Sequence, residues 1–327
     1  MEYRRPLERA ARRSVDDLSL TAKLSSAPLP SIAAVIPCHN SSESLELTLA
    51  SLRDQDIPAN EVICVDDNSG SLEANRQERL AHSYGAQYLR LPYDHRNRGR
   101  RSLARNAGTR QARAEVVLYV DSDMVLAPSY IASLRLIHGV HPRTLVKGTR
   151  IDVDKAFSSW PNEQEIRDRS LAVRPGAEYG AASSEPADTS STPSPSPLST
   201  GTRRDKHPIC SGLYVSGHWD WCASNNLSVR RRHVVAVGGW DEHFVGWGEE
   251  DIELAYRLFL AGVEPVVQLS GPLTALHLNH VVDIDANMHS LEKNGLYFVR
   301  KFPEVLARRR LAYRQHGIVF DELEARR

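Results

Sequence analysis

The chain has 327 residues, of which 41% are hydrophobic and 25% charged, as in a globular protein of one or two domains. Its 41 basic and 41 acidic residues cancel, so no overall positive charge points to nucleic acid as a partner. No run approaches the ~18–20 apolar residues that span a bilayer. With no visible secretory signal and four widely spaced cysteines, we expect a cytoplasmic protein without an integral membrane segment.

Apolar runs alternate with amphipathic stretches in the first half of the chain. Residues 1–29 are charged and poorly periodic, and we expect an extension with a helix near Leu7–Leu24. From Ser31 we expect helices at Glu43–Arg53, Leu72–Tyr84 and Arg101–Arg113, and strands at Ile32–Ile36, Val62–Val65, Tyr88–Leu91 and Val116–Val120. This order predicts an α/β fold with a mostly parallel central sheet and helices on both faces.

The second half begins after a segment of different composition. Gly176–Thr202 is rich in Pro, Ser, Thr, Ala and Gly and cannot bury enough apolar surface to offset its ordering entropy. We expect a disordered loop there, either a gating lid or a variable surface insertion. Beyond Ile209 we expect strands at Asn225–Val229 and Val263–Leu269, a helix or strand at Val234–Val237, helices at Glu250–Ala261 and Leu291–Phe302, and an arginine-rich tail on the surface.

An acidic triplet, Asp121-Ser122-Asp123, directly follows the apolar run Val116–Val120. In such sheets, ligands bind beyond the carboxyl ends of the strands, where Asn40 and Asp67 also fall. Two carboxylates at that edge can hold Mg²⁺ or Mn²⁺, which in turn can hold a diphosphate. The pattern alone is weak, because a bare Asp-x-Asp is more often a solvated turn and recurs at Asp54/Asp56, Asp152/Asp154 and Asp283/Asp285.

Two further stretches of the first half could contact a nucleotide. Polar groups in Pro37–Asn40 and Asp66–Ser69 could bind a base and a ribose, or could simply form turns. Asn97–Gly108 opens an amphipathic helix with arginines. That helix could contact phosphate, or it could present an ordinary solvated basic face.

In the second half, Gly246–Asp251 presents three carboxylates at the start of a helix. They could cap the helix, or one could act as a general base toward an acceptor hydroxyl. Trp240 and Trp247 favour the second interpretation, because aromatic rings commonly stack on sugars. His277 and His280 could complete a carboxylate metal site.

From about Ser31 to about His280, these stretches together resemble the inverting GT-A glycosyltransferases of family 2. The family's Pro-x-Tyr-Asn turn corresponds to Pro37–Asn40, where His39 replaces the tyrosine. Its Asp-Asp-Gly-Ser turn corresponds to Asp66–Ser69, its Asn-x-Gly…Ala-Arg-Asn-x-Gly helix to Asn97–Gly108, and its Asp-x-Asp to the acidic triplet. Residues 226–230, 238–242 and 246–251 are similar to the catalytic half of chondroitin-polymerase-like and β4-galactosyltransferase-like enzymes.

The resemblance implies a role for each matching residue. A UDP-sugar donor would be held by Asp67 at the uracil, by Arg105 near the base or diphosphate, and by Asp121 at the ribose. Mn²⁺ or Mg²⁺ would be bound by Asp123 and Asp121, with His277 as third ligand and His280 in reserve. Asp251 would deprotonate the acceptor hydroxyl, and Glu250 would bind acceptor hydroxyls. The other residues expected at the donor are Pro37, His39, Asn40, Ser122 and Trp247.

The resemblance also implies a layout and a reaction. We expect an extension (1–29), a nucleotide-sugar-binding half (30–150), a variable excursion (151–208), an acceptor and catalytic half (209–285) and a helical tail (286–327). The expected reaction is metal-dependent, inverting sugar transfer from a UDP-sugar to a hydroxyl of a soluble acceptor, such as a bacterial natural-product intermediate. The alternatives are a retaining transferase or a sugar nucleotidyltransferase on the same fold, or a noncatalytic carbohydrate-binding protein. The intact Asp121/Asp123 and Glu250/Asp251 pairs argue against the last.

Overall fold

The computed structural model describes residues 29–96, 99–153, 213–280 and 283–315. The helix expected near Leu7–Leu24 and the loop expected at Gly176–Thr202 lie outside these residues. Within them, no helix combines the length and the apolar character that a membrane crossing requires.

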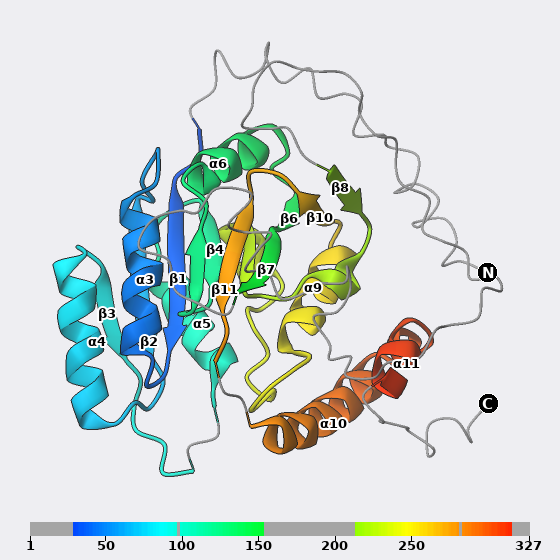
Figure 1. Ribbon diagram of the computed structural model, residues 1–327. Helices are drawn as coiled ribbons and strands as arrows, with labels where there is room; N and C mark the ends of the chain where they lie inside the picture. Colours follow the sequence, from blue (N-terminus) through cyan, green and yellow to red (C-terminus); the bar gives the residue numbers. More distant parts are fainter. Residues whose placement is uncertain (1–28, 97–98, 154–212, 281–282, 316–327) are drawn as a thin grey trace.

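An eight-stranded sheet forms the centre of the protein, with the strand order β3-β2-β1-β4-β9-β6-β10-β8 (Figure 1). Only β9 and β8 run against the other strands, so the predicted mostly parallel α/β sheet is confirmed. Its strands are β1 (Ile32–Cys38), β2 (Glu61–Asp66), β3 (Gln87–Arg90), β4 (Val116–Val120), β6 (Thr144–Lys147), β8 (Leu213–Ser216), β9 (Asn226–Arg230) and β10 (Glu264–Ser270).

Helices cover both faces of this sheet because successive residues of its strands point into different cores. Ile32, Ala34 and Ile36 of β1 share one core with α3, α4 and α6. Ala33 and Val35 share the other with α5, α9 and α10. The helices are α3 (Ser42–Arg53), α4 (Ser71–Ser83), α5 (Arg101–Gln111), α6 (Tyr130–Val140), α8 (Arg231–Ala236), α9 (Glu250–Leu260), α10 (Ile284–Lys301) and α11 (Leu306–Gln315), with short 3-10 helices η3 (Trp219–Trp221) and η4 (Pro303–Val305).

A second, three-stranded sheet, which the sequence did not predict, has the order β5-β11-β7. Its strands are β5 (Met124–Leu126), β7 (Thr149–Val153) and β11 (Thr274–Leu278). β11 runs beside β7, to which it is parallel, and is antiparallel to β5 (Figure 1). Because β5 begins directly after the acidic triplet, this small sheet joins the triplet to the histidines near the end of β11.

Helix α5 packs unusually close to β1. A Cβ atom on Gly108 would lie 2.3 Å from Cγ1 of Val35, so no larger residue fits there without movement. This glycine of the Asn97–Gly108 motif is therefore explained by packing between helix and sheet.

The C-terminal part of the chain differs from the sequence prediction in two ways. α10 begins at Ile284, well before the expected Leu291, because the Asp283 carboxylate caps it by accepting from the Ala286 N–H at 3.0 Å. The expectation of a surface tail is wrong for α11, whose Arg309 is only 4% exposed. Arg309 forms an ion pair with the fully buried carboxylate of Glu249.

Candidate metal site and active-site pocket

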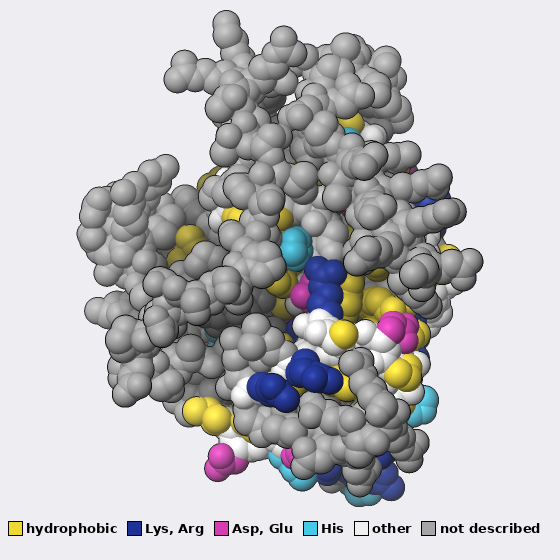
Figure 2. All heavy atoms as spheres, turned by 90° about the vertical axis from the view of Figure 1, so that its right-hand side faces the viewer, with side chains coloured by type: hydrophobic (Ala, Val, Ile, Leu, Met, Phe, Trp, Pro, Cys, Tyr) yellow, Lys and Arg dark blue, Asp and Glu magenta, His cyan; other side chains and the backbone are white. Residues whose placement is uncertain are grey.

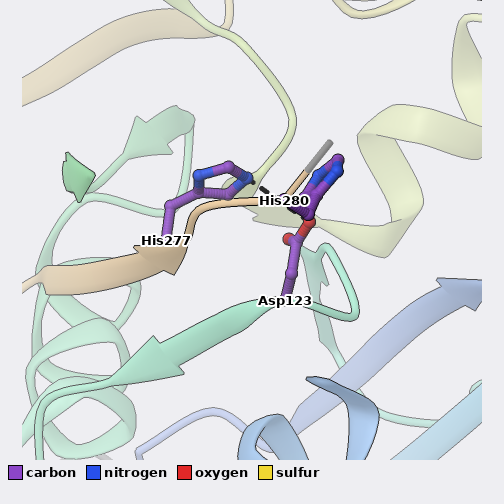
Figure 3. A group of neighbouring side chains, drawn as sticks. All are labelled: Asp123, His277 and His280. Atoms are coloured by element: carbon purple, nitrogen blue, oxygen red, sulfur yellow. Dashed lines mark ion pairs between the residues drawn. The ribbon is translucent and has the colours of Figure 1, made fainter. Parts of the chain in front are cut away.

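Asp123, His277 and His280 bring their ligand atoms within 4.8 Å of one another (Figure 3). The Nε2 atoms of His277 and His280 lie 3.3 and 3.1 Å from the same Oδ2 of Asp123. Main-chain pairing fixes this arrangement, because Met124 pairs with His277 and the Asp123 carbonyl accepts from the Leu278 N–H at 2.9 Å. The structure thus unites the predicted metal ligand with both candidate histidines. Asp121 is not in this group.

These three side chains have the electrostatics and the donor atoms of a metal site. Burial opposes ionisation of Asp123, but the two imidazoles outweigh it and hold the pKa of its carboxyl well below the usual range. Its Oδ1 is buried and has no hydrogen-bond partner among the described residues. One carboxylate and two imidazole nitrogens suit a transition-metal ion better than Mg²⁺, which prefers oxygen ligands.

A pocket opens beside this cluster, with about 490 Å³ of empty space when the adjoining open solvent is included. Five of the predicted site residues line it, namely Arg105, Asp121, Trp247, Glu250 and Asp251. Figure 2 shows basic, acidic and histidine side chains close together near the middle of one face of the molecule. The acidic triplet and the Gly246–Asp251 turn, far apart in sequence, therefore contribute to the same pocket.

Arg105 connects these two acidic stretches. Its guanidinium donates to Glu250 Oε1 at 3.0 Å and to Asp121 Oδ1 at 3.2 Å, and it stacks over the ring of Trp240 at 4.7 Å. Asn106 next to it exchanges two hydrogen bonds of 2.8 Å with the Trp240 backbone. Both side chains are buried. At these positions α5 therefore does not present a solvated basic face, which was one of the two interpretations of the sequence.

Asp251 stands at the start of α9, after a turn with unusual backbone conformation. Gly248 has φ +94°, and a Cβ atom there would lie 2.8 Å from Cδ1 of Leu291. The Asp251 carboxylate accepts from the Ser224 N–H at 3.0 Å and the Ile252 N–H at 2.8 Å. Burial, together with the neighbouring Glu250 carboxylate, raises the pKa of Asp251 to about 7. A carboxylate of this pKa can accept a proton near neutral pH.

Four of the residues expected at the donor lie at the ends of β1 and β2 and do not line this pocket, namely Pro37, His39, Asn40 and Asp67. Asp67 accepts from the Arg100 N–H at 2.5 Å and from its Nε at 2.8 Å. His39 Nδ1 lies 2.7 Å from the Asp67 carbonyl, and Asn40 Oδ1 accepts from the Gly70 N–H at 2.9 Å. The two turns thus hold each other, while His39 and Asn40 stay exposed; Pro37 and Ser122 are partly exposed.

Four polar residues that line the pocket were not among the predicted site residues, namely Arg101, Arg150, Ser224 and Asn225. Arg150 lies on β7, where Ile151 and Val153 alternate with polar residues. That alternation is a strand signal that could have placed Arg150 and Asp152 on one face. Ser224 and Asn225 precede β9, and the Asn225 carbonyl accepts from the Asp121 N–H at 3.1 Å.

Solved structures with a similar fold are GT-A glycosyltransferases. GalNAc-T7, solved with UDP, GalNAc and Mn²⁺, has a TM-score of 0.56 and 15% identity, over 92% of this chain and 57% of that chain. The mannosyltransferase PcManGT from Pyrobaculum calidifontis, solved with GDP-Man and Mn²⁺, has a TM-score of 0.53 and 13% identity, over 90% and 71%. The predicted GT-A fold is confirmed, and the fold and sequence define the protein as a glycosyltransferase.

The sequence profile of glycosyl transferase family 2 matches residues 33–205, and the chain belongs to this family. The profile described as the N-terminal domain of galactosyltransferase matches residues 208–281. Validoxylamine A glucosyltransferase of Streptomyces hygroscopicus subsp. jinggangensis (strain 5008) is 28% identical over 91% of this chain and 67% of its own length. The same enzyme of subsp. limoneus is 28% identical, and the chain spans 62% of its length. The uncharacterized glycosyltransferase YfnE of Bacillus subtilis (strain 168) is 27% identical over 78% of this chain.

Proposed function

We propose that this glycosyltransferase is metal-dependent and inverting, and that it moves a sugar from a UDP-sugar to a hydroxyl of a soluble acceptor. The observation that carries the proposal is the Arg105 bridge, which holds Asp121 and Glu250 at one pocket with contacts of 3.2 and 3.0 Å. Through it, the carboxylates assigned to the donor and to the acceptor face the same space.

Asp123, His277 and His280 would hold the cation, and their two imidazole nitrogens favour Mn²⁺ over Mg²⁺. GalNAc-T7 was solved with UDP and Mn²⁺ and PcManGT with GDP-Man and Mn²⁺, which supports this assignment. When bound, such an ion stabilises the negative charge on the leaving diphosphate. The nucleotide part of the donor would be contacted by Asp67, Pro37, His39, Asn40, Asp121 and Ser122.

Asp251 would take the proton from the attacking acceptor hydroxyl. Its pKa of about 7 leaves a substantial fraction ionised at neutral pH, while it is still basic enough to bind the proton. Glu250 would accept a hydrogen bond from an acceptor hydroxyl, and Trp247 would stack on the acceptor ring. Attack from the side opposite the diphosphate inverts the anomeric carbon.

We propose that the acceptor is a small molecule. The name of the validoxylamine A glucosyltransferases supports an acceptor of the natural-product class. We propose an acceptor that carries several hydroxyl groups, because the pocket offers both carboxylates and an indole ring.

The test is a thermal-shift panel of UDP-, GDP- and dTDP-sugars, each with and without Mn²⁺. A donor at a hundredfold over its Kd stabilises the folded state by about 2.7 kcal/mol. We expect stabilisation by a UDP-sugar that requires Mn²⁺ and is lost in Asp123→Ala. The control is Asp56→Ala, an exposed member of another Asp-x-Asp pair, which should respond like the wild type. Equal stabilisation of both variants would contradict the metal assignment.

Two further measurements separate the other reactions expected for this fold. A nucleotidyltransferase would respond to a nucleoside triphosphate and release pyrophosphate from it. A retaining transferase would keep the donor's anomeric configuration in the product, which NMR detects.

A further inference from the structure

We propose that Asp152 is a positioning residue that orients His277 for metal binding, an inference that rests on the proposed metal site. Asp152 belongs to an Asp-x-Asp pair that the family resemblance leaves without a role. The juxtaposition that carries the inference is a line of three side chains, Asp152, His277 and Asp123, held by adjacent strands.

The imidazole of His277 lies between two carboxylates. Its Nδ1 is 2.7 Å from Asp152 Oδ1, and its Nε2 is 3.3 Å from Asp123 Oδ2. The main chain fixes the first contact, because His277 and Asp152 are direct partners in the parallel ladder of β11 and β7. Asp152 is therefore built into the sheet beside the histidine.

Because Arg150 lies beside His277, Asp152 decides whether Nδ1 of His277 carries the proton. It holds Asp152 Oδ1 with its Nε at 3.0 Å and its Nη2 at 2.6 Å, and the same Nη2 lies 3.0 Å from His277 Nδ1. A guanidinium can only donate, so it competes for a bare Nδ1, whereas Asp152 accepts from an Nδ1–H. With the proton on Nδ1, the lone pair of Nε2 is free for a cation at Asp123. Without Asp152, Arg150 would favour the opposite tautomer, whose Nε2–H cannot bind metal.

Carboxylates that accept from the second nitrogen of a ligating histidine fix its ring and its tautomer, and their loss typically costs about 10–100-fold in metal affinity. Two of the other Asp-x-Asp pairs have different roles. Asp54 pairs with Arg53 on the exposed surface, and Asp283 caps α10. Neither joins the group formed by Asp123, His277 and His280.

The experiment measures Mn²⁺ binding to the 327-residue chain by the EPR signal of free Mn²⁺, without donor or acceptor. We expect Asp152→Ala to raise the Kd for Mn²⁺ by about 10–100-fold. Asp56→Ala should bind like the wild type, and Asp123→Ala should lose the site. Circular dichroism checks that each variant is folded. If Asp152→Ala is not folded, Asp152→Asn replaces it, with the same expected loss, because Arg150 would hold the amide oxygen and leave its NH₂ facing Nδ1.

The outcomes separate this inference from the proposed function. If the wild type binds Mn²⁺, Asp123→Ala does not, and the Asp152 variant stays within twofold of the wild type, the positioning role is overturned and the metal site stands. If the wild type binds Mn²⁺ no more tightly than Asp123→Ala does, both the metal site and the role of Asp152 are overturned.

Discussion

The proposed role of Asp251 as general base predicts how turnover depends on pH. If Asp251 is the base, only its ionised form is active, and its pKa of about 7 makes that fraction about one-tenth at pH 6 and about nine-tenths at pH 8. We therefore expect kcat/KM to rise about tenfold between these two pH values and to level off above. The assay is UDP release at saturating Mn²⁺. Asp251→Asn should lower kcat/KM by about 10²–10⁴ and abolish the slope.

Two neighbours of Asp251 should move this pH profile in opposite directions. Glu250 raises the pKa of Asp251 and Arg105 lowers it, through their charges. Glu250→Gln should therefore shift the rise in kcat/KM to lower pH, and Arg105→Met should shift it to higher pH. Asp56→Asn, at an exposed carboxylate, should leave the profile in place. A flat wild-type profile, or shifts of the same sign in both variants, would refute the assignment of Asp251 as base.

Three further predictions concern stability and metal removal. Arg309→Met should lower the free energy of unfolding by about 3–5 kcal/mol in urea titrations, because it leaves the buried Glu249 carboxylate without its cation. The control Arg79→Met, at an exposed arginine, should change it by less than about 0.5 kcal/mol. Equal effects would show that the buried ion pair is not what stabilises α11. Gly108→Ala should cost about 1–3 kcal/mol in the same assay through the clash with Val35, and a stabilised variant would mean that β1 yields to the added methyl. EDTA should abolish UDP release, with Mn²⁺ restoring more of it than Mg²⁺; full recovery with Mg²⁺ alone would contradict the imidazole ligands.

The central sheet could be predicted because its signals are local. β4 is buried at all five positions and reads as a continuous apolar run, and the helices between the parallel strands show amphipathic faces. The small sheet could not be predicted in this way. β5 has three residues, and β7 is only partly buried except at Val153, so neither gives a long apolar run.

In the candidate site, too, the residues with a local sequence signal could be predicted, and the contacts between distant segments could not. The motifs that match the family identified Asp123, Arg105 and the Gly246–Asp251 turn, and the structure brings them to one pocket or its edge. The contact of Asp152 with His277 depends on the register between two strands far apart in the chain, which no local pattern encodes. The burial of Arg309 likewise depends on where α11 returns to the turn before α9.

Metal-dependent, inverting transfer from a UDP-sugar can be tested directly through hydrolysis of UDP-sugars by the wild-type protein, with water in place of the unknown acceptor. NMR can follow UDP release and the anomer of the newly formed sugar before it equilibrates in solution. We expect Mn²⁺-dependent release of UDP with the inverted anomer formed first, and no release by Asp123→Ala. Release with the retained anomer would contradict the inverting mechanism. No release from any UDP-, GDP- or dTDP-sugar with Mn²⁺ or Mg²⁺ would contradict the proposed donor chemistry.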